Sequence, residues 1–201
     1  MNKKKLAIFA SGSGSNAEAI AKFFEGHPKV EVSMILSDKA KAYVHTRAHN
    51  MGIPSTTFTR EEFYQTEKIK VLLQQNDIDF VVLAGFMWLV PHYLVQSFTN
   101  RIFNIHPALL PKYGGKGMYG HHVHEAVIAA GEKESGITIH LVNEEYDKGK
   151  ILCQERLEVL SDDTPDSLAS RIHVLEHQHY PATIESYLLN DLQGHFESGI
   201  N

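Results

Sequence analysis

Short hydrophobic runs alternate with amphipathic stretches along the first half of the chain. Each run is bounded by Gly, Pro, Asn or Asp, which is typical of buried strands in a parallel sheet. The intervening stretches repeat hydrophobic residues at the helical period, and Thr59 with Glu62 forms a capping-box pattern before one of them. The pattern predicts strands at residues 6–10, 30–36, 53–58 and 79–84, and helices at 17–25, 42–50 and 60–75.

The second half is less regular. Pro91 is expected to open a short helix, and the glycine-rich segment 113–120 to form a mobile loop. Thr164 and Pro165 have the N-cap and N1 chemistry of a long final helix. The remaining elements predicted are a strand at 101–104, a helix at 122–130, two strands at 136–142 and 150–158, and the final helix at 165–189.

Together these elements predict one α/β domain. Strands that alternate with helices build a doubly wound, mostly parallel, Rossmann-like sheet. The last two strands are joined by a turn at 147–149, so we expect an antiparallel C-terminal pair followed by the long C-terminal helix. A chain of 201 residues is long enough for one domain with a sizeable core.

Composition narrows the classes of partner. The net charge of −5 argues against a protein held to nucleic acid by phosphate contacts. No hydrophobic stretch approaches the roughly 18 residues of a membrane span, and the run at 6–10 is shorter than the apolar core of a signal peptide. We therefore expect no membrane or nucleic-acid partner and a cytoplasmic location.

The segment after the strand at 101–104 carries the strongest candidate chemistry. Asn104 and His106 are two residues apart on an extended segment, so their side chains share a face. An amide donor beside a titratable imidazole can stabilise an oxyanion and move a proton at an acyl carbon. The same pair would also suit a strand end that only satisfies backbone groups. The presence of Asp147 favours the catalytic interpretation, because its carboxylate could orient or charge the imidazole if the fold brings the two side chains together.

The loop after the first strand is a candidate anion site. Gly12 and Gly14 permit close backbone approach, and Ser15 and Asn16 add donors where a helix begins. Ala17 stands where the dinucleotide fingerprint needs its third glycine, so a single phosphate monoester is the simplest ligand. A plain strand–helix turn is the alternative interpretation.

A hydrophobic segment at residues 85–90 follows the fourth strand, at the edge where open α/β sheets bind ligands. It could form the wall of a pocket for a flat heterocycle, or it could be ordinary core. Farther along, His173 and Glu176 share the polar face of the final helix. His121, His122 and His124 invite a metal hypothesis, but His-x-His on a flexible loop is poorly preorganised and we expect no metal.

These motifs together resemble those of the phosphoribosylglycinamide formyltransferases, a folate-dependent family of purine biosynthesis. The resemblance covers nearly the whole chain. It rests on Ser11-Gly12-Ser13-Gly14-Ser15-Asn16, Val82-Leu83-Ala84-Gly85-Phe86-Met87, the segment 104–113, Gly136-Ile137-Thr138-Ile139-His140, Asp147-Lys148-Gly149 and Glu176-His177. The motif at 104–113 and its aspartate are common to folate formyltransferases, whereas the loop at 11–16 points to a ribose-phosphate acceptor.

The resemblance implies roles for individual residues. It implies a phosphate-binding N-terminal half, about 1–100, and a catalytic and folate-binding half, about 101–201. The phosphate site would be Gly14, Ser15 and Asn16. The glycinamide site would be Gly85, Met87, Glu176 and His173. The folate site would be Arg60, Met87, Trp88, Leu89, Val90, Asn104 and His140, with residues 140–147 over the pterin.

Two further details follow from the resemblance. Leu110-Pro111 would be a cis peptide next to the catalytic segment. Trp88 stands where many members carry arginine, so contacts to the folate tail would differ there.

The implied reaction is direct formyl transfer from 10-formyltetrahydrofolate, a co-substrate, to the amine of glycinamide ribonucleotide in IMP biosynthesis. The amine attacks the formyl carbon to give a tetrahedral intermediate. Asn104 and a protonated His106 would stabilise its oxyanion, and Asp147 would raise the pKa of His106. The implied partners are these small molecules, with the protein a monomer or weak homodimer.

Other functions remain open at this point. A methionyl-tRNA formyltransferase would carry an added basic domain, and a formyl-folate hydrolase a regulatory domain in front; we expect neither here. The phosphate loop disfavours a sugar-nucleotide formyltransferase. A non-catalytic phosphate-binding protein would have no use for Asn104, His106 and Asp147 together.

Overall fold

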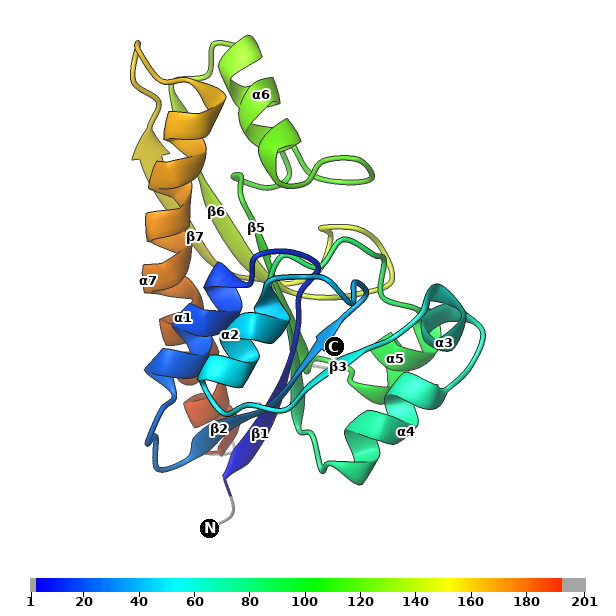
Figure 1. The fold of residues 1–201 in the computed structure, drawn as a ribbon. Helices are drawn as coiled ribbons and strands as arrows, with labels where there is room; N and C mark the ends of the chain where they lie inside the picture. The colour runs from blue at the N-terminus through cyan, green and yellow to red at the C-terminus, as the bar shows by residue number, and fades with distance from the viewer. Residues whose placement is uncertain (1–2, 193–201) are drawn as a thin grey trace, which may run out of the picture.

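The computed structural model describes residues 3–192, and they form a seven-stranded sheet with helices on both faces (Figure 1). The strand order is β3-β2-β1-β4-β5-β6-β7. The strands are β1 (Lys4–Phe9), β2 (Val30–Ser37), β3 (Ser55–Thr57), β4 (Phe80–Leu83), β5 (Ile102–His106), β6 (Glu134–Leu141) and β7 (Ile151–Glu158). The helices are α1 (Ser15–Phe23), α2 (Val44–Asn50), α3 (Arg60–Tyr64), α4 (Lys68–Gln75), α5 (His92–Ser97), α6 (His121–Ala129) and α7 (Pro165–Leu192).

The pairing of strands confirms the predicted fold class. β1 to β5 are parallel, β6 runs antiparallel to β5, and β7 runs antiparallel to β6. The chain builds outward from β1 to β3 and then returns to place β4 on the other side of β1. The strand order therefore reverses between β1 and β4, and such a reversal opens a crevice at the carboxyl ends of the strands. The single-domain prediction extends to residue 201, and its last nine residues lie outside those described.

Successive side chains of β1 point to opposite faces of the sheet, so they belong to two separate parts of the core. Leu6 and Ile8 pack with α1, α2, α6 and α7, whereas Ala7 and Phe9 pack with α3, α4 and α5. All four side chains are fully buried, which explains the continuous hydrophobic run at this strand.

Two predicted elements differ from the structure. The helix expected at 60–75 is two helices, α3 and α4, although its capping box between Thr59 and Glu62 is present. The break occurs where the Thr66 hydroxyl donates to the Glu62 carbonyl and accepts from the Lys68 N–H, which replaces regular helical bonding with a local turn. The strand expected at 53–58 is shortened to β3, at the edge of the sheet.

Helix α7 begins at the predicted Pro165 and spans one face of the sheet. The fully buried Tyr180 donates its hydroxyl to the carbonyl of Leu83, 3.0 Å away, at the end of β4. This bond fixes α7 against the carboxyl edge of the sheet, where the predicted site residues lie. No helix within residues 3–192 is both long and apolar enough to cross a membrane.

Candidate active site

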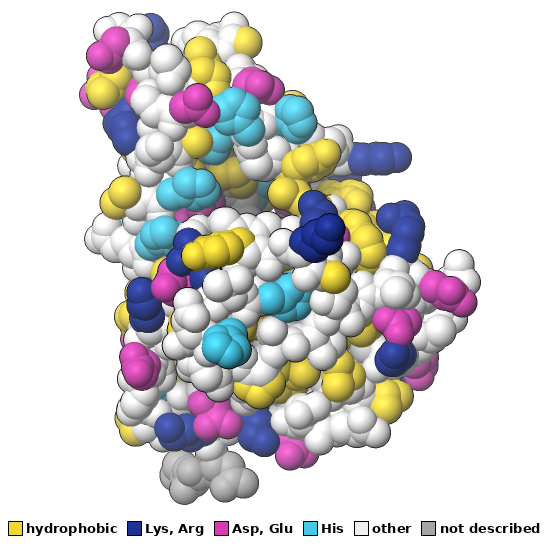
Figure 2. All heavy atoms as spheres, in the orientation of Figure 1, with side chains coloured by type: hydrophobic (Ala, Val, Ile, Leu, Met, Phe, Trp, Pro, Cys, Tyr) yellow, Lys and Arg dark blue, Asp and Glu magenta, His cyan; other side chains and the backbone are white. Residues whose placement is uncertain are grey.

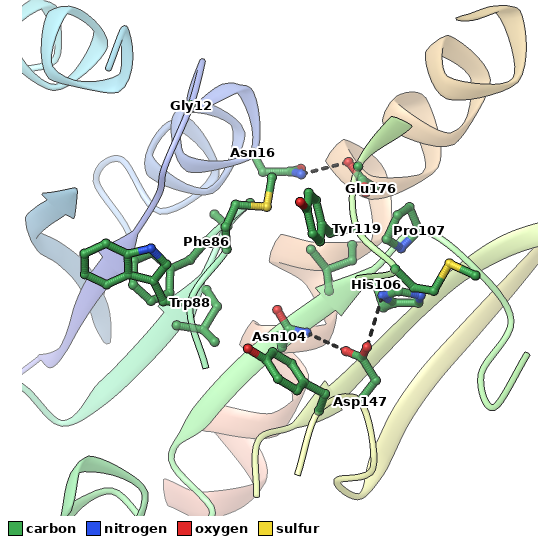
Figure 3. Close-up of a pocket in the computed structure, with 18 of the residues that line it drawn as sticks. Gly12, Asn16, Phe86, Trp88, Asn104, His106, Pro107, Tyr119, Asp147 and Glu176 are labelled. Atoms are coloured by element: carbon green, nitrogen blue, oxygen red, sulfur yellow. Dashed lines mark hydrogen bonds and ion pairs between the residues drawn. The ribbon is translucent and has the colours of Figure 1, made fainter. Parts of the chain in front are cut away.

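A cleft of about 650 Å³ lies at the carboxyl ends of β1, β4 and β5 (Figures 2 and 3). Figure 2 shows it as a hollow between α6 and the body that carries α1 and α2, with histidine and hydrophobic side chains at its edges. All but one of the predicted site residues line this cleft, the exception being Arg60. The volume is typical of a small-molecule site.

The loop before α1 forms one end of the cleft. Gly14 has φ +75°, and a Cβ there would lie 2.4 Å from Val44 Cγ2, so glycine is required both by conformation and by space. Arg47 donates to the Ser13 carbonyl, and the Val44 N–H donates to the Gly12 carbonyl. These contacts hold the loop so that the first N–H groups of α1 face the cleft, as an anion site requires.

Glu176 completes this end from α7. Its carboxylate is 4% exposed and accepts from Asn16 Nδ2 at 2.8 Å, as the dashed line in Figure 3 marks. His173 Nδ1 lies 2.8 Å from the same oxygen, and this hydrogen bond to Glu176 raises the pKa of His173. The structure therefore brings together three residues that the resemblance assigns to the acceptor substrate.

Asn104 and His106 form the other end, on one face of β5 as their spacing predicted. Asp147 reaches them from the β6–β7 connection. Its Oδ1 lies 3.5 Å from Asn104 Nδ2 and its Oδ2 3.7 Å from His106 Nδ1 (Figure 3). The Gly115 N–H donates to Oδ2 at 2.9 Å and holds the carboxylate in place.

The contacts of His106 indicate which of its two ring nitrogens carries the proton when the ring is neutral. Its Nε2 lies 2.7 Å from the Tyr113 carbonyl, which can only accept, so Nε2 carries a proton. The other nitrogen, Nδ1, faces Asp147. In the neutral ring Nδ1 is unprotonated, and a second proton there would face the Asp147 carboxylate as an ion pair.

Asp147 acts on the pKa of His106 in the expected direction, but the net shift is downward. Burial lowers this pKa below its usual value, and the opposing effect of Asp147 does not overcome the loss of solvation. For Asp147, burial raises the pKa, but the neighbouring His140 and His106 and the Gly115 N–H outweigh it and lower the pKa overall. At neutral pH the site therefore holds an ionised Asp147 carboxylate beside a largely neutral His106 imidazole.

His140 fixes the orientation of the Asn104 amide. Its Nδ1 lies 2.9 Å from the Leu141 carbonyl and must donate, so in the neutral ring Nε2 accepts from Asn104 Nδ2 at 3.0 Å. Both protons of the Asn104 amide therefore face acceptors within the protein, His140 and Asp147.

The hydrophobic segment after β4 forms a wall of the cleft. Phe86, Met87, Leu89 and Val90 line it, and Gly85 has φ +71° where the chain leaves β4. The Trp88 ring lies at the edge farthest from the catalytic end (Figure 3). The pocket interpretation and the core interpretation are therefore both partly right, since this segment also packs into the core between the sheet and α3, α4 and α5.

Arg60 is placed differently from the other predicted folate residues. It does not line the cleft but stacks on the outer aromatic side chains, 5.4 Å from the Trp88 ring and 4.9 Å from the Tyr64 ring. Any contact to a ligand in the cleft would pass through Trp88. Its role at a folate site stays a prediction.

Sequence reasoning missed part of the cleft. The glycine-rich loop lines it with Lys116, Met118 and Tyr119, and His124 from α6 is 3% exposed in its wall. The predicted Leu110-Pro111 cis peptide is present just before this loop. The histidines at 121–124 had been considered only as metal ligands, and within residues 3–192 no His, Cys, Asp and Glu cluster could hold a metal ion.

Comparison with known proteins places this geometry in a family. Residues 4–184 match the formyl transferase family. Phosphoribosylglycinamide formyltransferase of Bacillus subtilis is 36% identical over 190 residues, covering 92% of this chain and 95% of that protein. The chloroplastic phosphoribosylglycinamide formyltransferase of Arabidopsis thaliana is 42% identical over 184 residues, covering 89% of this chain and 63% of that protein.

Solved structures give the same result. The crystal structure of phosphoribosylglycinamide formyltransferase from Bacillus halodurans superposes with a TM-score of 0.83 at 40% identity, covering 92% of this chain and 95% of that one. The chain spans less than two thirds of the length of its chloroplastic relatives from Arabidopsis thaliana and Vigna unguiculata, at 63% and 61%.

Proposed function

The chain belongs to the formyl transferase family, and from that premise we propose that it formylates the primary amine of 5-phosphoribosylglycinamide. The formyl donor is 10-formyltetrahydrofolate, and the step belongs to IMP biosynthesis. One observation carries the proposal: Asn104, His106 and Asp147 meet at one end of a cleft whose other end combines a phosphate-type loop with the buried Glu176. That arrangement fits a phosphorylated acceptor whose reactive amine lies between the two ends.

Asn104 is the proposed donor to the oxyanion of the tetrahedral intermediate. Its two amide protons face His140 at 3.0 Å and Asp147 at 3.5 Å. The longer contact is the weaker one, so we expect that proton to turn toward the formyl oxygen. His140 would retain the other and keep the amide oriented.

His106 and Asp147 are the proposed proton-handling pair. Burial holds His106 neutral, but a developing oxyanion beside it would favour the imidazolium and raise its pKa. The proton would reside on Nδ1, between the ring and the Asp147 carboxylate. This is the proton that the attacking amine loses, relayed through Asp147 or water, and His106 returns it to the leaving nitrogen as the bond to the formyl carbon breaks.

The formyl folate is proposed to lie against Met87, Trp88, Leu89 and Val90, with His140 at its inner end. The hydrophobic wall fits a flat ring system, and the donors at the catalytic end fit its polar edge. The phosphate is assigned to the backbone at Gly14, Ser15 and Asn16. No step requires a metal.

Some features of this proposal rest on the family alone. These are the division into an N-terminal half of about 1–100 and a C-terminal half of about 101–201, and a monomer or weak homodimer. The cytoplasmic location rests on the sequence pattern. The cleft itself draws residues from both halves.

The test is to follow deformylation of 10-formyltetrahydrofolate with and without glycinamide ribonucleotide. Deformylation that requires the ribonucleotide, matched mole for mole by formylated acceptor, supports the proposal. Deformylation that proceeds equally without it identifies a hydrolase. No turnover in either reaction by folded protein contradicts a formyltransferase with this acceptor.

A further inference from the structure

Two buried polar atoms without a partner belong to the same cleft. Within residues 3–192, Asn16 Oδ1 and His124 Nδ1 are buried and make no hydrogen bond, and both residues line the cleft. Buried polar atoms are almost always satisfied, by protein, water or ligand. Unpaired atoms in a cleft wall therefore indicate what kind of group the cleft receives.

The unpaired atom of Asn16 is an acceptor. A carboxylate only accepts hydrogen bonds, so the contact of Nδ2 with Glu176 at 2.8 Å fixes the orientation of the amide. Its oxygen is left without a donor. Next to it, Glu176 has lone pairs beyond those that Asn16 and His173 occupy.

His124 adds a second acceptor beside Glu176. It projects from α6, which packs with α7 against the same core cluster, and its side chain is 3% exposed. Burial lowers the pKa of His124 to about 4, with Glu176 the strongest opposing charge and His173, His121 and His106 acting in the same direction as burial. At neutral pH the ring is uncharged, and one of its nitrogens accepts a hydrogen bond.

We infer, on the basis of the proposed function, that His124 is a further substrate-binding residue. With Asn16 Oδ1 and the Glu176 carboxylate it forms a set of acceptors for the N–H and O–H groups of the ribosyl glycinamide. Phosphate oxygens are acceptors themselves and find no donor in Asn16 Oδ1, in the Glu176 carboxylate or in an unprotonated His124 Nδ1. The set therefore orients the acceptor substrate, with its phosphate at the loop before α1 and its donor-rich part toward Glu176 and His124.

The test uses the full chain and binding of glycinamide ribonucleotide, measured by calorimetry without folate. His124→Leu removes the acceptor, and His124→Asn restores one on a shorter side chain. Loss of a hydrogen bond to a neutral group predicts about 3- to 10-fold weaker binding for His124→Leu and partial recovery for His124→Asn. His122→Leu is the matched control, because His122 lies on the same helix but is exposed and outside the cleft.

A second binding measurement, with ribose 5-phosphate, distinguishes the two groups of the substrate that could donate to His124, the ribosyl hydroxyls and the glycinamide N–H groups. An equal loss of affinity for ribose 5-phosphate assigns the contact to the ribosyl hydroxyls, whereas a loss confined to glycinamide ribonucleotide assigns it to the glycinamide N–H groups. Either result supports the inference.

Two results would overturn the role of His124. The first is wild-type affinity for the ribonucleotide in His124→Leu. The second is an equal loss of ribonucleotide and folate affinity in both variants, which would indicate a structural effect. Wild-type protein that neither binds nor formylates the ribonucleotide overturns the proposed function and the inference with it. Wild-type turnover with unchanged binding in His124→Leu overturns the inference alone.

Discussion

The phosphate loop and the catalytic end of the cleft are assembled in different ways. The loop before α1 is one short contiguous segment whose shape depends on Gly14 and on contacts with α2. The catalytic end joins three separate segments, with Asn104 and Asp147 43 residues apart and the Tyr113 carbonyl holding the ring of His106. The comparison separates local from long-range determinants of a site. A local motif can be read from sequence as a unit, whereas an assembled site depends on how the whole sheet and its connections are arranged.

The largest expected effect is at the catalytic end. Asn104→Ala should lower kcat by about 100- to 1000-fold, because it removes an oxyanion donor. His106→Ala should act similarly through loss of proton transfer. Binding of glycinamide ribonucleotide should change little, since the phosphate loop is intact. Steady-state kinetics and calorimetry check both parts, with Asn76→Ala, exposed at the C-cap of α4 and outside the cleft, as the control. Near-normal turnover in either catalytic variant contradicts the assigned roles.

Acid should destabilise the folded protein through the buried histidines of the cleft. The folded pKa of His124 is about 4 and its unfolded value is 6.5, so between these values the unfolded chain binds a proton that the folded protein excludes. The free energy of unfolding should therefore fall as the pH drops from 6.5 to 4, by about 3 kcal/mol from this residue alone. The lowered pKa of His106 acts in the same direction.

Urea unfolding from pH 7 to pH 4 measures this dependence. The slope should be smaller in His124→Asn, and His122→Asn on the same helix should keep the wild-type slope. An identical slope in His124→Asn and wild type would show that His124 is solvated or partnered in solution.

Substitution of Gly14 in the phosphate loop should be restricted by the space around it and by its backbone conformation. Gly14→Ala should cost about 2 kcal/mol of stability, from a positive φ together with overlap with Val44. Gly52→Ala is the matched control, since Gly52 has φ +67° and an added Cβ meets nothing within 4 Å. It should cost only about 1 kcal/mol. Denaturant unfolding measures both. Equal losses would show that α2 moves to accommodate the added methyl group.

The smallest effect is expected at Arg60. Its guanidinium reaches the cleft only through Trp88, so Arg60→Ala should raise the KM for formyl folate by no more than about 3-fold, as for an exposed cation–π contact. The KM for the ribonucleotide should not change. A much larger effect on folate would mean that Arg60 contacts the ligand directly.

Local patterns predicted much of the fold and part of the site. The alternation of hydrophobic runs specified the doubly wound sheet, and Thr59, Pro165 and the spacing of Asn104 and His106 predicted element starts and a shared face correctly. These features depend on a few adjacent residues. The break at Thr66 was missed, because a side-chain hydrogen bond to the Glu62 carbonyl competes with a helix that periodicity alone favours.

The rest of the site could not be predicted, because it depends on burial and on segments far apart in the chain. The proximity of Asp147 to His106 appeared as a condition on the fold. Burial, whose cost is not visible in sequence, lowers the pKa of His106 overall, although Asp147 raises it as expected. The partner of His106 Nε2 is a backbone carbonyl, which no residue type signals. His124 looked like one member of a histidine-rich loop until its burial was known.

The hydrogen bond between Asn16 and Glu176 joins residues 160 positions apart. During synthesis, therefore, the acceptor end of the cleft cannot close until Glu176, in the first half of α7, has left the ribosome, although β1 and the phosphate loop emerge first. A nascent chain that already contains every parallel strand still lacks this contact. Competence for substrate is thus acquired late and in one step, and a chain interrupted before Glu176 would carry an open cleft.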